Sequence, residues 1–373
     1  MMFRPYRALV PTSLALLAIT SASGGASGGS APPPPAPPPL TPAALDDQPL
    51  SVMTYNVEGL PWPVALGREE ALARIGDRLA AMRAQGRQPH IILLQEAFTP
   101  EAAQIAARAG YAHVAAGPDA ALRSPVAATG ADIAYLNQAR WDRGEQADKS
   151  LGSGLLILSD YPIVAINRLA FPDFACAGFD CLANKGVLIA HLAVPGIAGP
   201  VAVVNTHLNA RKAAAVPIDR AQQAFDRQAG LAARFVAAHV PASRPMILGG
   251  DMNIGKDARR AGSFFTRFAQ AGLRFITPGW SGLRRALSPG LPFERESEHH
   301  LRRAADHGKD WLFARDAQDM PMPVLRASAP FGADADGEGL SDHVGYMVTY
   351  GLEEARAVRL AGRKMPAAVA GGA

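Results

Sequence analysis

Short apolar runs alternate with polar segments along the chain from residue 49 onward. Such runs predict buried strands, which we expect at residues 50–55, 90–95, 155–159, 187–192, 201–206, 245–248, 310–313 and 344–350. Apolar residues at helical spacing predict one helix through Leu72, Ile75, Leu79 and Met82 and another over about 217–238. Thr99 followed by Pro100 predicts a further helix start, because threonine caps helices and proline suits the first helical position.

Few helices separate these strands, so many connections must run directly from strand to strand. That pattern favours two β-sheets packed face to face with helices outside over a doubly wound parallel sheet. We therefore predict an α/β sandwich that forms a single domain over residues 49–352.

The N-terminal segment has the pattern of an export signal. Arg4 and Arg7 precede an apolar run over residues 8–19, and small residues follow around 21–23. A membrane-spanning helix needs about 20 apolar residues, so the short run favours a cleaved signal peptide over the alternative, an uncleaved membrane anchor. We predict a signal peptide over 1–23 and an exported protein, periplasmic or secreted.

The segments on either side of the predicted domain differ from it in composition. Residues 24–48 are rich in Gly, Ser and Pro and predict an extended spacer, whereas residues 353–373 are rich in Ala, Gly and Arg and predict a flexible tail. Hydrophobic residues make up 49% of the chain, which is enough for a large core. The formal net charge of +4 could attract phosphate, nucleic acid or an anionic membrane. Arginines scattered along helices are more often ordinary solvated residues, and we favour that interpretation.

The chain has two cysteines, Cys176 and Cys181. In the oxidising compartment that a signal peptide predicts, this pair could close a small disulfide loop. Two free thiols are the alternative. The spacing does not indicate zinc, since no second pair exists to complete a tetrahedral site.

Polar side chains recur where the predicted strands end. A single acid in such a position is usually a turn residue or a helix cap. Turn chemistry alone does not explain carboxylate, amide and imidazole side chains at one strand end after another. Because a sandwich gathers strand ends on one rim, these residues are candidates for a common site. They are Asn56, Glu96, His207, Asn209, Asp251, Asn253, Asp310, Asp342 and His343.

The residue types suit a hard cation and a phosphate. Mg²⁺ takes oxygen ligands, commonly one or two protein carboxylates plus substrate oxygens. Glu96 and Asn56 could supply that shell. His207, Asn209 and Asn253 could then donate hydrogen bonds to phosphate oxygens as negative charge develops.

A histidine held by a carboxylate is suited to remove a proton from water. The carboxylate fixes the tautomer of the ring and stabilises the imidazolium that forms. Asp310 and His343 are the candidates for this pair, and Asp342 would support it.

Six motifs follow one another along the chain: Thr-Tyr-Asn56-Val, Leu-Leu-Gln-Glu96, Asn-Thr-His207-Leu-Asn209, Gly-Gly-Asp251-Met-Asn253, Lys-Asp310-Trp-Leu-Phe and Ser-Asp342-His343. In this order they resemble the motif series of the endonuclease/exonuclease/phosphatase superfamily, over about residues 50–351. The resemblance implies a four-layered α/β sandwich, with two packed mixed sheets flanked by helices. It also implies cleavage of a phosphate ester by in-line attack of water, with Mg²⁺, Mn²⁺ or another divalent cation. Glu96 would be the principal metal ligand, with Asn56 close to it.

The resemblance assigns the remaining roles residue by residue. His343 would be the general base, oriented by Asp310. Asp251 and Asn253 would orient the nucleophile or assist the leaving oxygen, and His207 would stabilise the charge on phosphorus. An exchange of acid and base roles between Asp251 and His343 stays open.

One segment bears on the substrate. Asp180-Cys-Leu-Ala-Asn184-Lys185-Gly186 resembles the pattern of neutral sphingomyelinases, which are phospholipases of the C type. Lys185 would then contact a substrate phosphate; the alternative is a surface lysine at a strand start. The resemblance favours phospholipid over nucleic acid as substrate, with peripheral membrane contact. We expect a monomer and infer no protein partner.

The chain also departs from the sphingomyelinase pattern. Residues 314–340 lack the aromatic pair of the hairpin with which bacterial secreted sphingomyelinases insert into membranes. Trp62, Trp280 and Phe293 lie in other predicted loops, where they could face a membrane or a base. Exposed aromatics are more often packed locally.

Two alternative functions remain. A secreted nuclease of the same superfamily would need a basic groove, which the doublets Arg211-Lys212, Arg259-Arg260, Arg284-Arg285 and Arg302-Arg303 could provide. A catalytically silent binding module on the same fold is the other. The full set of polar positions argues against it.

Overall fold

The computed structural model describes residues 49–61, 64–288, 295–333 and 339–351. The predicted signal peptide, spacer and tail lie outside the described residues, as do Trp62, Phe293 and the acidic run 334–338.

Eleven strands form two mixed β-sheets. The strands of the first sheet are β1 (Leu50–Gly59), β2 (Ile91–Ala97), β3 (His113–Ala116), β4 (Leu156–Ser159), β10 (Val324–Phe331) and β11 (Gly345–Tyr350). Those of the second are β5 (Ile163–Ala170), β6 (Gly186–Leu192), β7 (Val201–His207), β8 (Met246–Asp251) and β9 (Asp310–Arg315). The strand orders are β10-β11-β1-β2-β4-β3 and β5-β6-β7-β8-β9. Each sheet has a parallel pair at its centre, β1 with β2 and β7 with β8.

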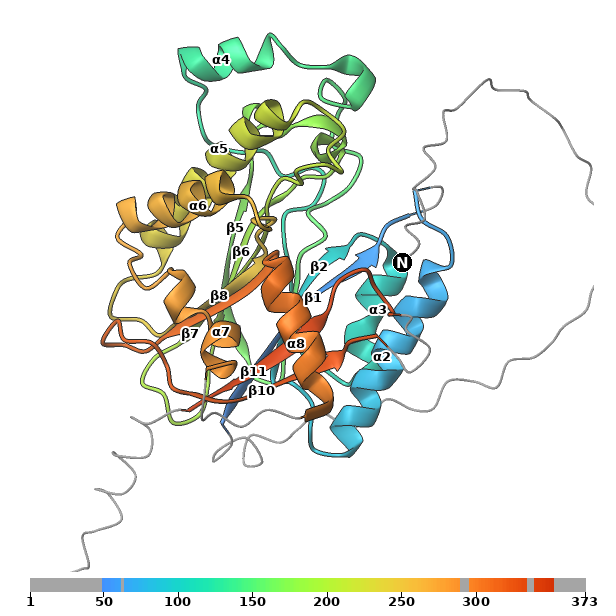
Figure 1. Cartoon of the computed structure of the whole chain (residues 1–373), viewed down its shortest axis with the longest axis vertical. Coiled ribbons are helices and arrows are strands. Elements are labelled where there is room, and N and C mark those ends of the chain that lie inside the picture. The colour runs from blue at the N-terminus through green and yellow to red at the C-terminus, as the bar shows by residue number, and fades with distance from the viewer. Residues whose placement is uncertain (1–48, 62–63, 289–294, 334–338, 352–373) are drawn as a thin grey trace, which may run out of the picture. The chain divides into compact units, whose positions relative to one another are not determined.

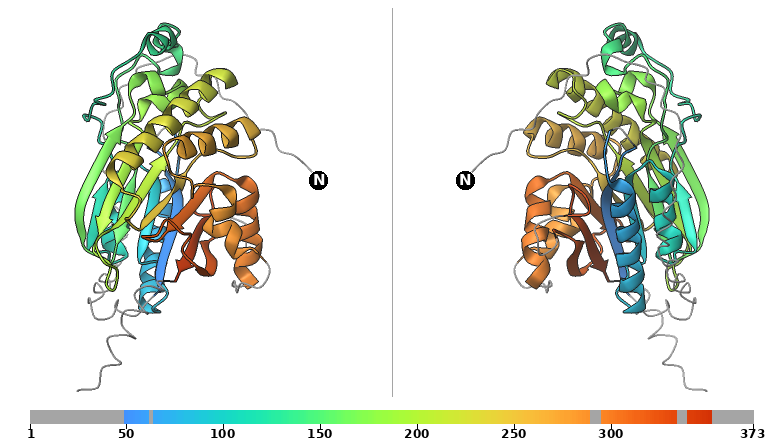
Figure 2. Two further views of the ribbon diagram at one scale, coloured as in Figure 1. Left: turned by 90° about the vertical axis from the view of Figure 1, so that its left-hand side faces the viewer. Right: turned by 90° about the vertical axis from the view of Figure 1, so that its right-hand side faces the viewer.

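Helices cover the outer faces of the two sheets (Figures 1 and 2). Helices α2 (Arg68–Ala84) and α3 (Pro100–Arg108) pack on the first sheet, and α5 (Ile218–His239) and α6 (Ala258–Gln270) pack on the second. The other helices are α4 (Gly130–Leu136), α7 (Gly282–Ala286) and α8 (Arg295–His307). The predicted four-layered α/β sandwich is confirmed.

The central strands are buried on both faces, which explains their continuous apolar runs. In β1, Val52 belongs to the core between the sheets, whereas Met53 and Tyr55 pack with the apolar faces of α2 and α3. In β2, Ile91 likewise belongs to the core between the sheets, and Ile92 packs with the helices. Each fully buried side chain of this size contributes about 1.5–3 kcal/mol relative to an exposed one.

The helix start that Thr99 and Pro100 predict is confirmed. Thr99 caps α3 by accepting a hydrogen bond from the backbone N–H of Ala102, and Pro100 is the first helical residue. Trp280 is half-buried, with its ring near that of Phe275, so it packs locally instead of facing a membrane or a base.

Candidate active site

The polar strand ends meet on one rim because of the strand directions. Parallel pairing brings the carboxyl ends of β1 and β2 together, and likewise those of β7 and β8, which end at His207 and Asp251. β9 runs antiparallel to β8, so its first residue, Asp310, lies opposite Asp251. His343 precedes β11, which is antiparallel to β1. The two sheets meet at this rim, since Asn56 Nδ2 donates to Asp251 Oδ2 across 3.3 Å.

Glu96, His207 and Asp251 form a group that could hold a metal. Their ligand atoms lie within 4.8 Å of one another. Asn56 Nδ2 donates to Glu96 Oε1 at 2.8 Å, while its Oδ1 accepts from the backbone N–H of Glu58 at 3.0 Å. Through Nδ2, Asn56 therefore orients both carboxylates. Two converging carboxylates with an amide and an imidazole fit a divalent cation, because the cation would offset their mutual repulsion.

Burial controls the ionisation of this group. Burial raises the pKa of Glu96, against the hydrogen bond from Asn56, so its charged form is disfavoured without a cation. Burial, with the nearby ammonium of Lys185, lowers the pKa of His207 to about 3, so the ring is neutral at neutral pH. A neutral imidazole can bind a metal or donate one hydrogen bond.

Two site residues have left-handed backbone. Glu96 has φ 55° and Asn253 has φ 49°, in the region that disfavours residues with a side chain. Such strain costs roughly 1–3 kcal/mol and persists where the surroundings enforce it, commonly at functional sites. Gly250 lies just before Asp251, and a Cβ there would come 2.0 Å from Thr206 O. Glycine thus permits the close approach of β8 to β7.

His343 and Asp310 form a tight pair. His343 Nδ1 donates to Asp310 Oδ2 at 2.7 Å, and both side chains are buried. The other ring nitrogen, Nε2, faces the cluster, 3.7 Å from Asp251 Oδ2. Burial alone would lower the pKa of His343, but the carboxylates of Asp310 and Asp251 outweigh it and raise the pKa to about 10. A divalent cation beside Asp251 would oppose this effect and favour the neutral ring that a base requires.

Lys185 is buried beside His207, not exposed at the rim. Its side chain is 5% exposed, and its Nζ lies 2.9 Å from Asp180 Oδ2 and 3.2 Å from His207 Nε2. An ammonium only donates, so His207 Nε2 accepts and its proton sits on Nδ1. That nitrogen has no hydrogen-bond partner among the described residues.

The two predicted amides differ in their surroundings. Asn209 is fully buried, and its Oδ1 and Nδ2 bond to the backbone of Ala177 and Ala210. Those contacts support loops instead of leaving the amide open to a substrate. Asn253 is partly exposed, and its Nδ2 donates to Leu208 O at 2.9 Å. Of Asn209 and Asn253, only Asn253 borders an open cleft.

The structure also brings residues to the site that the sequence analysis did not select. Gln95 and Asn205 are fully buried and link the sheets directly beneath the rim, with Gln95 Nε2 2.8 Å from Asn205 Oδ1. Arg260 is fully buried and donates to the backbone oxygens of Asn209 and Asn253. Lys309 Nζ lies 3.4 Å from His343 Nε2. Gln95 and Asn205 are polar residues inside apolar runs, and this pattern could have identified them from the sequence.

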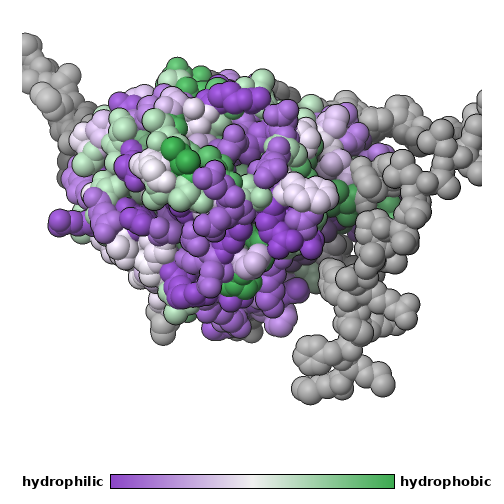
Figure 3. Space-filling model, turned by 90° about the horizontal axis from the view of Figure 1, so that it is seen from above, coloured by the Kyte–Doolittle hydropathy of each residue, from purple (hydrophilic) through white to green (hydrophobic). Residues whose placement is uncertain are grey.

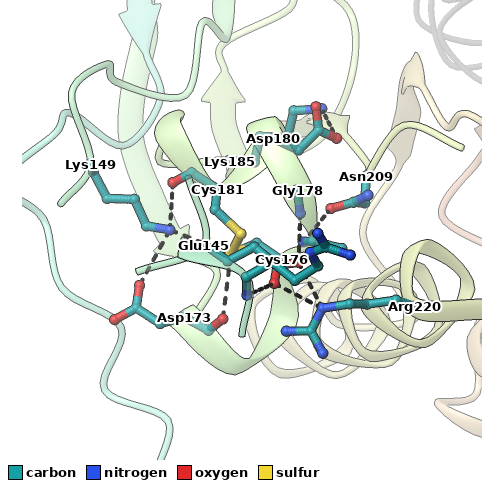
Figure 4. Close-up of a disulfide and its surroundings, with 12 residues drawn as sticks. Glu145, Lys149, Asp173, Cys176, Gly178, Asp180, Cys181, Lys185, Asn209 and Arg220 are labelled. Carbon is teal, nitrogen blue, oxygen red and sulfur yellow. Dashed lines mark hydrogen bonds and ion pairs between the residues drawn. A yellow bond between two sulfur atoms is a disulfide. The ribbon is translucent and has the colours of Figure 1, made fainter. Parts of the chain in front are cut away.

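A disulfide joins Cys176 and Cys181 (Figure 4). The loop that it closes is held by Glu145, which accepts from the backbone N–H of Gly178 at 2.7 Å. Gly178 has φ 63°, and a Cβ there would come 1.7 Å from Ala214 O, so the loop requires glycine. The loop carries Asp180, which holds Lys185 beside His207.

Loss of this disulfide is expected to lower activity without unfolding the domain. The double variant Cys176→Ser/Cys181→Ser should lose about 2 kcal/mol of stability, as the chain-entropy relation gives for so short a loop. Looser placement of Asp180 should lower kcat about three- to tenfold. Thermal unfolding and kcat of the wild type should respond to a phosphine reductant, whereas the variant should not. Equal wild-type activity with and without the reductant would contradict this positioning role.

Comparison with known proteins assigns the family. The chain belongs to the endonuclease/exonuclease/phosphatase family, whose model matches residues 53–343. Members of this family are hydrolases that act on phosphodiester bonds, a reaction that suits the residues gathered at the rim. No curated protein matches the chain. Within the described part of the chain, no helix is both long and apolar enough to span a membrane.

Solved structures share the fold. Sphingomyelinase C from Streptomyces griseocarneus is similar with a TM-score of 0.53 and 20% identity, covering 81% of this chain and 99% of that one. A beta toxin variant from Staphylococcus aureus with bound magnesium ions is similar with a TM-score of 0.53 and 14% identity, covering 81% and 100%. At such low identity the likeness concerns the fold alone.

Proposed function

We propose that the protein is an exported, Mg²⁺-dependent phosphodiester hydrolase of the phospholipase C type. The observation that carries the hydrolase assignment is the hydrogen-bonded pair of Asp310 and His343, in which the other ring nitrogen, His343 Nε2, faces Asp251 in the carboxylate cluster. A general base next to a cation-binding group is the arrangement that hydrolysis of a phosphate ester by water needs.

Each residue of the site has its own role in the proposed reaction. When bound, Mg²⁺ would polarise the phosphate and offset its developing charge. Glu96 and Asp251 would hold it. His343 Nε2 takes the proton of the attacking water, and Asp310 stabilises the imidazolium through Nδ1. Asn253 orients the water or the leaving oxygen.

A second group of residues, behind the carboxylates, can stabilise negative charge on the phosphate. The ammonium of Lys185 lies in contact with the imidazole of His207 behind the carboxylates, and its positive charge can stabilise the phosphorane-like charge. Because Lys185 is buried and held by Asp180, it acts through His207 more than by direct contact with substrate.

Phospholipid is the substrate we favour. Asp180 and Lys185, the residues of the sphingomyelinase-like segment, form an ion pair at the site. Phe179, which is next to Asp180, is 46% exposed, and Trp141 is 80% exposed. The face seen from above in Figure 3 is mostly hydrophilic with small separate hydrophobic patches. These features support peripheral contact of a monomer with a membrane surface.

The competing candidate is a secreted nuclease. Of the four basic doublets, the pair Arg211-Lys212 lines a cleft beside the site. Arg260 is buried, and Arg259 and Arg302 form ion pairs with Asp219 and Glu298. Burial and ion pairing thus make Arg259, Arg260 and Arg302 poor candidates for a basic groove along a nucleic acid backbone.

Purified protein with Mg²⁺ should be assayed against sphingomyelin, a lysophospholipid, plasmid DNA and RNA. Release of a phosphorylated headgroup is the expected result. Cleavage of nucleic acid without lipid would establish the nuclease instead, and no hydrolysis of any diester would overturn the proposal. Export is tested separately, by the N-terminal residue of protein recovered from the periplasm or medium, which should lie around 21–28.

A further inference from the structure

A cleft of about 690 Å³ opens beside the proposed reaction centre. It is lined by the segment after β7, the loop between β8 and α6, and the residue before β9. Asn253 and Lys309 connect it to the reaction centre, since Lys309 Nζ lies 3.4 Å from His343 Nε2. The volume suits a group the size of a small ligand or a headgroup.

Positive charge is concentrated in this cleft. The whole chain has six lysines. Three of them, Lys212, Lys256 and Lys309, line the cleft together with Arg211 and one carboxylate, Asp257. Arg211 forms an ion pair with that carboxylate at 2.8 Å. Within the part of the chain that the structure describes, none of the three lysines forms an ion pair with a carboxylate, so Lys212 and Lys256 can offer their charge to a ligand. The ammonium of Lys309 also acts on the carboxylates of Asp251 and Asp310.

We propose that this cleft binds a second phosphate of the substrate, one that is not cleaved. The inference rests on the proposed phosphodiester hydrolysis. Lys309 contacts the catalytic histidine, so a phosphate held by Lys309 and Lys256 would be a close neighbour of the phosphate under attack. A quaternary ammonium headgroup would instead bring positive charge into a cationic cleft. The cleft therefore favours a diester that carries a second phosphate over a choline diester.

Two sources could supply that phosphate: a phosphorylated lipid headgroup, or the next phosphate of a nucleotide chain. Paired substrates distinguish them. The lipid pair is phosphatidylinositol and phosphatidylinositol 4-phosphate in mixed micelles. The nucleotide pair is thymidine 5′-(p-nitrophenyl phosphate) with and without a 3′-phosphate. The members of each pair differ by one phosphate and share the bond that is broken.

The test variant is Lys212→Gln/Lys256→Gln, which leaves Lys309 and its contact with His343 in place. The control Arg87→Gln/Arg274→Gln removes the same charge from exposed positions outside the cleft. For at least one pair, wild type should prefer the member with the second phosphate about tenfold or more in kcat/KM. The test variant should lose most of this preference through KM, whereas its kcat/KM for the other member should change less than about twofold.

The outcomes distinguish failure of the phosphate subsite from failure of the proposed hydrolase function. Preference in the lipid pair or in the nucleotide pair, lost in the test variant and kept in the control, supports the subsite and identifies its source. Hydrolysis without any preference, or a preference that the test variant keeps, overturns the subsite while the hydrolase proposal stands. Absence of hydrolysis in all four substrates and in sphingomyelin would instead reject the proposed function.

Discussion

Glu96→Gln is expected to lower kcat by about 10³-fold or more while the domain stays folded. The change removes a carboxylate at nearly constant volume, and the amide oxygen can still accept the hydrogen bond from Asn56. A bound divalent ion stabilises the transition state by several kcal/mol, and each 1.36 kcal/mol is tenfold in rate. Titration calorimetry should show weaker Mg²⁺ binding in the variant. EDTA should inactivate the wild type, and added Mg²⁺ should restore it.

Stability separates this effect from misfolding. Since burial raises the pKa of Glu96, ionisation of Glu96 destabilises the metal-free fold as pH rises above the unfolded-state pKa of about 4.3. Without metal at neutral pH, Glu96→Gln should therefore melt no lower than wild type. The control Glu298→Gln removes a carboxylate from the exposed side of α8 and should leave kcat and Mg²⁺ binding unchanged. Undiminished hydrolysis in excess chelator would defeat the metal assignment.

The sequence predicts the fold best where strands are buried on both faces. β1, β2, β7 and β8 are such strands, and the polar residue that ends each run was predicted at the rim for that reason. Half-exposed strands were missed. β5 carries exposed residues along much of its length, and β10 follows two prolines, so neither has a continuous apolar run.

Helix α6 shows a different reason for a miss. Its Phe264 and Phe268 face the core at helical spacing, but the two arginines at its start resemble a surface doublet. One of these, Arg260, is buried because two backbone oxygens accept from it. Such burial depends on tertiary partners from distant segments, which a local pattern cannot supply.

The same limit applies to the site. The strand ends identify which residues gather at the rim, but not which atoms meet. Lys185 could be placed near a strand start, yet its burial depends on Asp180 and hence on the disulfide loop. Lys309 carried no signal of its own, because its significance comes from the cleft that three separate segments form.

His343→Ala and Asp310→Ala should each lower kcat by about 10²–10⁴-fold, the range of general base catalysis. The double variant should lose little more than His343→Ala alone, since residues that act as one unit give non-additive penalties. Asp342→Ala is the matched comparison. Its side chain is 63% exposed and 3.9 Å from His343 Nε2, so solvent screens it and its removal should lower kcat less than about tenfold.

The pH dependence of kcat tests which residue is the base. A base must be neutral to accept a proton, so activity should rise with pH through the pKa of His343. The carboxylates of Asp310 and Asp251 raise that pKa against the effect of burial. Asp310→Ala removes one of them, and the acid limb should therefore move to lower pH. In His343→Ala the limb should disappear. Fully additive penalties together with an unmoved acid limb would transfer the base role to Asp251, whose pKa the two neighbouring histidines lower against the effect of its burial. Metal binding by Glu96 could survive that result, because it depends on the carboxylate cluster and not on the His343–Asp310 pair.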